Sequence, residues 1–252
     1  VNENDFETVK KTDAVSFWKN NYSSRNCTIF LAGKITETVK ALLDEFLSFE
    51  WNIKEDVKPV AVHITPNSQT KHFTLREDAL QSAIRIGRPF IKKNHPDFVK
   101  VQVLITILGG YFGSRLMSNI REDKGYTYGI GAFVMPLLHE GVFAISTEVG
   151  SDVTSLALRE IYAEIKKLRE ELVSEQELTL VKSYLMGEIL KSVDGPFSIV
   201  ERWKSMILYE TDKNYFDSLI AIVTNITPEE IREMAIKYLQ DKDLYEVVVG
   251  KK

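Results

Sequence analysis

Two side chains that donate hydrogen bonds, Arg121 and Tyr128, stand on either side of the dipeptide Lys124-Gly125. Glycine permits a sharp change of chain direction there, which can bring the guanidinium and the phenol to one site. Both groups are donors suited to oxygen acceptors. From the residues alone, an alternative interpretation stays open: Arg121 as a solvated charge at a helix end and Tyr128 as an ordinary strand aromatic.

The segment 108–133 that carries this pair predicts a helix, a turn and a strand in succession. A helix over 98–108, capped by Asp97, is expected before it. The strand over 127–134 is expected to pair with a neighbouring strand over 142–149. Glycines open the segment, and the apolar side of its short helix is formed by Leu116, Met117 and Ile120.

No complete catalytic motif is visible elsewhere in the sequence. H-x-x-E-H is absent, and no histidine has a second His or a Glu at the spacing that places two ligands on one helical face. The glycines at the start of segment 108–133 follow a helical pattern rather than a strand, which argues against a phosphate-binding loop. The serine-nucleophile motif Gly-x-Ser-x-Gly does not occur either. We therefore expect no metal site in this chain. The histidines concerned are His63, His72, His95 and His139.

The composition is that of an ordinary globular protein. The chain has 252 residues, of which 44% are hydrophobic, with a net charge of −4. Positive and negative residues are interspersed, so no basic stripe predicts nucleic-acid binding. Cys27 is the single cysteine, which excludes an intrachain disulfide. No apolar run approaches the roughly 20 residues of a membrane span, and both a cytoplasmic and a periplasmic location stay open.

Two parts of unequal size are expected. Residues 1–57 predict a helix capped by Thr12, a strand over 27–32 and a second helix capped by Thr36, followed by a linker to about residue 70. Residues 71–252 predict a complete α+β domain. In that domain we expect adjacent strands over 71–76 and 80–88 around Glu77-Asp78, helices capped by Ser174 and Thr227, and a final strand over 245–249.

The two parts share one arrangement. A Thr-capped helix followed by a strand closes the chain, and the same order opens it. Residues 1–57 are therefore predicted to be the tail of a preceding domain that is homologous to 71–252. The first residue is Val rather than Met, which suggests an excised or processed piece of a longer protein.

The segment from Ser114 to Gly131 closely resembles the signature of the non-catalytic half of the pitrilysin-like, or inverzincin, zinc metallopeptidases. This family includes insulin-degrading enzyme and the mitochondrial processing peptidase. The resemblance covers most of residues 10–250. Its core is a Leu-Gly-Gly run, a Ser-Arg-Leu triplet and an Arg-Glu-x-x-Gly-x-x-Tyr pattern, which fall on Leu108–Gly110, Ser114–Leu116, and Arg121, Glu122, Gly125 and Tyr128.

The resemblance implies an α+β fold, with a mainly antiparallel sheet against a helical layer, as in LuxS and the mitochondrial processing peptidase. It implies that Arg121 and Tyr128 bind an extended peptide and assist its hydrolysis. It also implies that zinc belongs to an H-x-x-E-H partner domain or subunit, so this chain has no catalytic zinc residue and should be inactive alone.

Three hypotheses follow for the function. The first is the substrate-binding half of a zinc peptidase. The second is a structural protein of the same fold that lost its activity, like core subunits of respiratory complexes, although retention of both Arg121 and Tyr128 argues against it. The third is a stand-alone module that captures extended peptides by strand addition.

Overall fold

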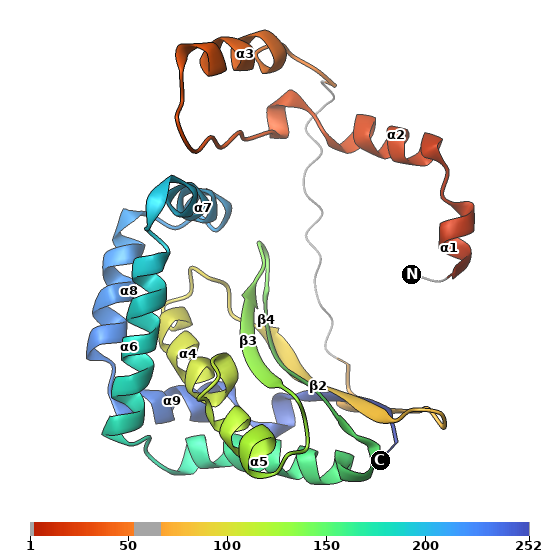
Figure 1. The fold of residues 1–252 in the computed structure, drawn as a ribbon, viewed down its shortest axis with the longest axis vertical. Coiled ribbons are helices and arrows are strands. Elements are labelled where there is room, and N and C mark those ends of the chain that lie inside the picture. The colour runs from red at the N-terminus through yellow and green to blue at the C-terminus, as the bar shows by residue number, and fades with distance from the viewer. Residues whose placement is uncertain (1–2, 53–66, 252) are drawn as a thin grey trace. The chain divides into compact units, whose positions relative to one another are not determined.

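The computed structural model describes residues 3–52 and 67–251 (Figure 1). These residues form two compact units, one of 3–52 with Asp194–Lys204, and one of 67–193 with 205–251. Arg121 and Tyr128 both belong to the second unit. No described helix is both long enough and apolar enough to cross a membrane.

A five-stranded sheet in the order β1-β5-β2-β4-β3 forms the centre of the second unit. Neighbouring strands are antiparallel except β1 and β5, which are parallel. The predicted pairing of the strands near 127–134 and 142–149 is confirmed, since β3 pairs with β4. The strands are β1 (Lys71–Leu75), β2 (Gln81–Phe90), β3 (Ile130–Pro136), β4 (Gly141–Gly150) and β5 (Tyr245–Gly250).

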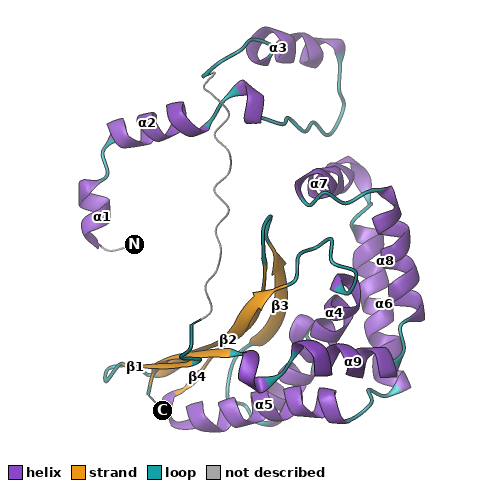
Figure 2. Ribbon diagram, turned by 180° about the vertical axis from the view of Figure 1, so that it is seen from behind, coloured by secondary structure: helices purple, strands orange, loops and turns teal. Residues whose placement is uncertain are grey.

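Helices lie along one side of this sheet (Figure 2). The predicted α+β fold, a mainly antiparallel sheet against a helical layer, is therefore confirmed. The helices of the second unit are α4 (Phe98–Ile105), α5 (Thr154–Glu170), α6 (Glu175–Lys191), α8 (Lys213–Asn225) and α9 (Pro228–Tyr238), with π-helical turns η2 (Thr106–Gly110) and η3 (Met117–Asp123) and short 3-10 turns η4 (Ser151–Val153) and η5 (Asp241–Asp243).

The strands bury alternate residues, which separates a helix-covered face from an open one. Ile84 and Ile86 of β2 and Ile145 of β4 are fully buried on the covered face. Arg85 and Glu148, on the same two strands, point to the open face and are exposed. The helices complete the core with fully buried side chains that include Leu104, Leu108, Ile161, Ile165 and Leu168.

The expected adjacency of the strands over 71–76 and 80–88 is wrong. β5 lies between β1 and β2, and its Glu246 is in register with Lys71 while its Val249 is in register with Ala83. A turn favours pairing of the strands that flank it only when no other strand competes. The run of valines in β5 has high strand propensity, and the central position buries Val248 completely.

The predicted helix caps at Thr36, Ser174 and Thr227 are confirmed. The Ser174 hydroxyl accepts the Glu177 N–H at 3.1 Å, and the Thr36 hydroxyl accepts the Val39 N–H at 3.3 Å. The Thr227 hydroxyl likewise accepts the backbone N–H of Glu230, and the Glu230 carboxylate accepts the Thr227 N–H. Local sequence signals therefore predict the starts of these helices correctly.

Asp97, in contrast, does not cap the helix that follows it. Its carboxylate accepts hydrogen bonds from Lys237 Nζ at 2.6 Å and from the Tyr238 hydroxyl at 2.7 Å. These bonds lower the pKa of Asp97, with Lys237 as the larger cause. Asp97 thus attaches α9 to the start of α4. The α-helix itself is shorter than the predicted 98–108, because its last turn continues as the π-helical turn η2.

The first unit is helical, and the strand predicted over 27–32 is wrong. Strand N–H and C=O groups need a neighbouring strand, and the described residues of this unit contain none. Thr12 does not cap the first predicted helix either, since Lys10 is the N-cap and its N–H donates to Asp13. The helices are α1 (Glu3–Thr8), α2 (Lys11–Asn21) and α3 (Glu37–Leu47), with the 3-10 turn η1 (Ser24–Asn26) and α7 (Gly195–Leu208), whose residues up to Lys204 belong to this unit.

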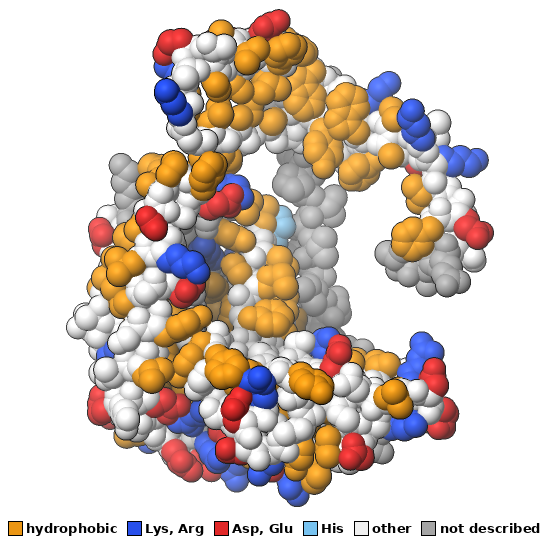
Figure 3. Space-filling view, viewed as in Figure 1, with side chains coloured by type: hydrophobic (Ala, Val, Ile, Leu, Met, Phe, Trp, Pro, Cys, Tyr) orange, Lys and Arg blue, Asp and Glu red, His pale blue; other side chains and the backbone are white. Residues whose placement is uncertain are grey.

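Large apolar side chains of the first unit remain accessible. Phe17 of α2 is 61% exposed and Phe46 of α3 is 60% exposed. Figure 3 shows hydrophobic side chains gathered over α3 and along α2. A set of apolar residues this exposed is typical of a surface that packs against another part of a protein.

Candidate functional site

Gly109 positions the segment that leads to the candidate residues. A Cβ atom on Gly109 would lie 2.5 Å from the backbone nitrogen of Ala132 and 2.7 Å from its Cβ. Only glycine permits this approach between η2 and β3, because any side chain would overlap the strand. Gly109 therefore allows η2 to pack closely on β3.

Arg115 connects the same segment to the start of α6. Its Nε and Nη2 each donate to a different carboxylate oxygen of Glu177, both at 2.8 Å. Burial lowers the pKa of Arg115, but the hydrogen bond and charge of Glu177 raise it, and the net change is upward. No local sequence pattern predicts this pair, because the two residues lie 62 positions apart in the chain. Bidentate geometry makes this a specific connection.

Replacing Arg115 by Ala is expected to lower the free energy of unfolding by about 2–3 kcal/mol, less than for a fully buried pair because the partners are partly solvated. The side chains of Arg115 and Glu177 are 18% and 25% exposed. Urea unfolding followed by circular dichroism measures the change. Lys166→Ala is the matched control, since that side chain is 61% exposed and 3.8 Å from Glu170. Equal stability of the two variants would contradict the assigned role of Arg115.

A second polar contact holds η3. Asn119 Nδ2 donates to the Glu164 carboxylate at 2.7 Å, and Lys167 Nζ donates to the same oxygen at 2.8 Å. The Glu164 side chain is 6% exposed, so its charge needs these partners. The hydrogen bond that Lys167 donates to Glu164 is the largest cause that raises the pKa of Lys167. These contacts attach η3, the turn that carries Arg121, to α5.

Arg121 lies on η3 with its guanidinium at the surface. The guanidinium carbon is 4.7 Å from the centre of the Phe112 ring, and Nη1 donates to Glu122 Oε1 at 2.7 Å. Phe112 is 65% exposed and the Arg121 side chain 33% exposed. The aromatic ring and the carboxylate restrict the guanidinium, while the donors not used by Glu122 remain accessible.

The predicted reversal after η3 is present. Gly125 has φ +66°, a left-handed conformation that favours glycine, and the Tyr126 N–H donates to the Ile120 carbonyl at 3.0 Å. The strand that follows begins at Ile130, later than the predicted 127, so residues 127–129 form a loop. Tyr128 is the central residue of this loop.

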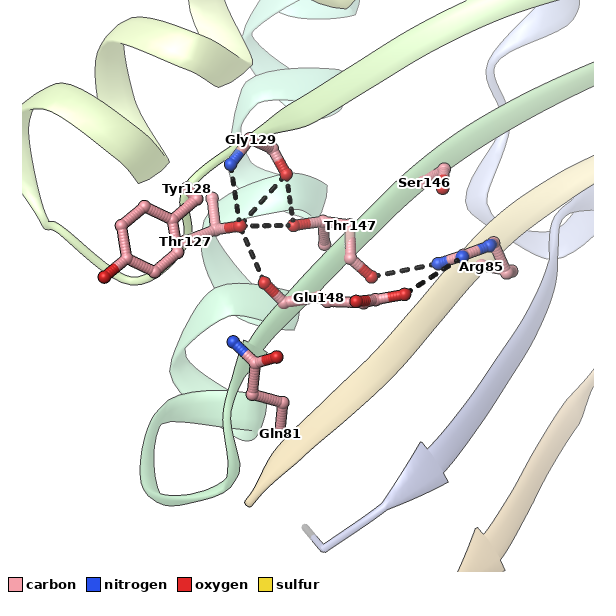
Figure 4. Close-up of a pocket in the computed structure, with 8 residues that line it drawn as sticks. All are labelled: Gln81, Arg85, Thr127, Tyr128, Gly129, Ser146, Thr147 and Glu148. Carbon is pink, nitrogen blue, oxygen red and sulfur yellow. Dashed lines mark hydrogen bonds and ion pairs between the residues drawn. The ribbon is translucent and has the colours of Figure 1, made fainter. Parts of the chain in front are cut away.

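Hydrogen bonds on both sides of Tyr128 hold its loop to β4 (Figure 4). The Thr127 hydroxyl donates to the Glu148 carbonyl at 2.7 Å and accepts the Gly129 N–H at 3.1 Å. The Thr147 hydroxyl lies 3.0 Å from the Thr127 hydroxyl and from the Gly129 carbonyl oxygen. Both neighbours of Tyr128 are thus fixed, and its ring points away from them and is 93% exposed.

An open depression of about 280 Å³ lies beside Tyr128 on the open face of the sheet. Most of its lining residues carry polar side chains. Arg121 is not among the lining residues, and none of the described interactions joins it to Tyr128, so the two predicted site residues do not share this depression. The lining residues are Gln81, Arg85, Thr127, Tyr128, Gly129, Ser146, Thr147 and Glu148.

The histidines do not form a metal centre in the described part of the chain. His72 Nε2 lies 3.0 Å from the Gln69 carbonyl oxygen, and His95 Nδ1 accepts the Asp97 N–H. His63 falls outside the described residues. Across 3–52 and 67–251, no three His, Cys, Asp or Glu side chains lie close enough to hold a metal. The described His, Cys, Asp and Glu side chains therefore do not fit a zinc ion.

A family model described as the peptidase M16 inactive domain matches residues 8–185. The chain therefore belongs to the M16 family of peptidases, as a representative of its inactive domain. This confirms the resemblance to the pitrilysin-like enzymes that the Arg-Glu-x-x-Gly-x-x-Tyr pattern indicated.

Relatives support the same assignment. A protein of Rickettsia bellii named an uncharacterized zinc protease is 27% identical over 233 residues, which are 90% of this chain and 52% of that protein. The non-peptidase homolog YmxG of Helicobacter pylori is 24% identical over 98% of this chain and 57% of its own length. The chain thus spans about half the length of these relatives.

Solved structures show the fold alone at this level of identity. The crystal structure of a peptidase M16 inactive domain from Pseudomonas fluorescens has a TM-score of 0.83 and 20% sequence identity. The similarity covers 99% of this chain and 60% of that chain.

Proposed function

We propose that this chain is the substrate-binding, non-zinc half of an M16-family zinc metallopeptidase. It closes over an extended peptide and assists its hydrolysis through Arg121 and Tyr128. The observation that carries the proposal is the placement of Tyr128, whose ring is 93% exposed on a loop hydrogen-bonded on both sides. A surface aromatic held this firmly, without a role in the core, suits a ligand-binding function.

The chemistry of the two side chains fits a peptide ligand. A peptide bound in extended form presents carbonyl oxygens, and a phenol and a guanidinium donate hydrogen bonds to them. Donors placed toward an oxyanion that develops during attack on a carbonyl lower the barrier of the reaction. In this proposal Arg121 and Tyr128 act on different oxygens of one substrate, in keeping with the lack of any described interaction between the two side chains. Zinc belongs to a catalytic H-x-x-E-H domain or subunit of the same family.

We further propose that residues 1–57 are the tail of a preceding homologous domain. The order of α9 and β5 supports this, because the described segment 11–32 has a helix followed by a strand-like sequence in the same order. The exposed apolar residues of α2 and α3 would pack against that domain.

Reconstitution tests the proposed function. The chain is mixed with the H-x-x-E-H protein encoded upstream in the same reading frame or in the neighbouring gene, and cleavage of fluorogenic peptides is followed. We expect activity that requires both components. A variant of the partner in which the Glu of H-x-x-E-H is replaced by Gln is the control and should abolish cleavage. Full activity of the partner without this chain would contradict the proposal.

The alternative is a catalytically inactive structural or peptide-binding homologue of the same fold. The observation that favours it is the name of the Helicobacter pylori relative, a non-peptidase homolog. Such a protein can bind extended peptides at the edge strand β3, which within the described sheet pairs with β4 alone. Peptide binding by this chain, combined with no cleavage in any mixture with a family partner, would support this alternative.

A further inference from the structure

A charged pair lies on the open face of the sheet, beside Tyr128. Arg85 of β2 faces Ser146 of β4 in register, and Glu148 lies two residues further along β4 on the same face. The Arg85 and Glu148 side chains are 49% and 59% exposed, and Arg85 Nη2 is 3.6 Å from Glu148 Oε1. Neither residue belongs to the Arg121–Tyr128 pair, and neither contributes to the core.

Arg85 is held in place by its backbone contacts rather than by Glu148. Its Nη1 donates to the carbonyl oxygens of Ile84 at 2.9 Å and of Thr147 at 3.0 Å, which uses both protons of that nitrogen. The 3.6 Å separation from Glu148 is longer than a hydrogen bond. Nη2 and the Glu148 carboxylate form an ion pair, drawn as a dashed line in Figure 4. Both side chains are about half exposed, so the guanidinium donors and the carboxylate acceptors lie side by side at the surface.

This arrangement selects for one type of ligand group. An acidic group that approaches Arg85 also meets the negative charge of Glu148, and a basic group that approaches Glu148 also meets Arg85. A carboxamide satisfies both residues at once, because its oxygen accepts from a guanidinium while its NH2 donates to a carboxylate. Gln81 and Ser146 add further uncharged polar groups to the same depression.

We propose that the depression formed by Gln81, Arg85, Ser146 and Glu148 is a subsite that binds the carboxamide side chain of a Gln or Asn residue in an extended peptide. The inference rests on the proposed peptide-binding function. The Thr127 hydroxyl connects the two sites, since it fixes the Tyr128 loop to the backbone of Glu148. A peptide that meets the Tyr128 phenol therefore lies within the same rigid part of the sheet as the subsite.

Binding of labelled peptides to the full 252-residue chain tests the subsite. The probes are short fluorescein-labelled Ala/Ser peptides that carry Gln, Glu, Lys or Leu at each position in turn, and fluorescence anisotropy reports their affinity. We expect one position at which Gln binds about tenfold more tightly than Glu, Lys or Leu. In Glu148→Gln, the preference at that position should move by about tenfold toward Glu, because Arg85 is left without a neighbouring negative charge.

Two further variants make the test specific. Arg85→Gln should shift the preference at the same position toward Lys, and Glu188→Gln, on the exposed side of α6, should leave the wild-type profile unchanged. The inference is overturned if no position distinguishes Gln, or if the profile of Glu148→Gln equals that of the wild type. If either result is obtained while Tyr128→Phe weakens the binding of all peptides alike, the carboxamide subsite is rejected and the proposed peptide-binding function is retained. Absence of peptide binding by the wild-type chain, in this assay and in the mixture with its partner, would reject the proposed function as well.

Discussion

Tyr128→Phe is expected to lower the turnover of the reconstituted peptidase by roughly 10- to 1000-fold while the fold stays intact. The substitution removes only a hydroxyl group. Tyr128 is 93% exposed, and none of the described hydrogen bonds uses its hydroxyl, so no stabilising contact is lost. Steady-state kcat/KM on a fluorogenic peptide, measured for wild-type and variant complexes, gives the effect. A melting temperature equal to that of the wild type establishes that the fold is unchanged.

Tyr22→Phe is the matched control for this substitution. Tyr22 is 55% exposed and belongs to the first unit, whereas the Tyr128 loop belongs to the second. Its replacement should leave kcat/KM unchanged. Arg121→Ala should reduce turnover over the same range as Tyr128→Phe, and Arg121→Lys should recover part of it through the retained charge. Unchanged turnover in both Tyr128→Phe and Arg121→Ala would show that the roles assigned to these residues are wrong.

Gly109→Ala is expected to lower the free energy of unfolding by about 2–3 kcal/mol, as much as the loss expected for Arg115→Ala. The new methyl group would lie 2.5 Å from a backbone nitrogen of β3, and a backbone atom cannot move aside as a flexible side chain can. Either η2 or β3 must shift, which disturbs the packing of Leu108, a fully buried residue. Urea unfolding at equilibrium, analysed at constant m-value, measures the change.

Gly187→Ala provides the comparison, because Gly187 lies within α6 and a Cβ atom there would have no neighbour within 4 Å. This variant should be as stable as the wild type or more stable by about 0.5–1 kcal/mol, since alanine is the better helix former. If Gly109→Ala and Gly187→Ala had the same stability, the close approach of η2 to β3 would not be the reason for glycine at position 109.

The elements that local signals determine were predictable from the sequence. Ser174 and Thr227 mark helix starts because a hydroxyl and a carboxylate three residues apart satisfy free N–H groups of the first turn. The same rule predicts a cap at Asp97 and is wrong there, because the Asp97 carboxylate accepts hydrogen bonds from Lys237 and Tyr238, which are distant in the sequence. The alternation of Ile84, Arg85 and Ile86 indicates a strand at β2, but it contains no information about which strand is the neighbour of which.

The candidate site was predictable in part for the same reason. Arg121 and Tyr128 stand out because a family pattern fixes their types and spacing. The contacts that position them come from distant segments: Arg115 with Glu177, and Thr127 with the carbonyl oxygen of Glu148. The pair of Arg85 with Glu148 depends on the register of β2 against β4, which no local pattern specifies.

The position of β5 between β1 and β2 has a consequence for the order of events during synthesis. β5 follows α9 in the chain, yet it lies between β1 and β2 and pairs with both. While residues 245–250 are still in the ribosome, β1 has no partner strand in the described sheet and β2 has an open edge. An unpaired edge of this kind can pair with another chain. The sheet can therefore close only late, and until then the nascent chain presents open strand edges to other chains.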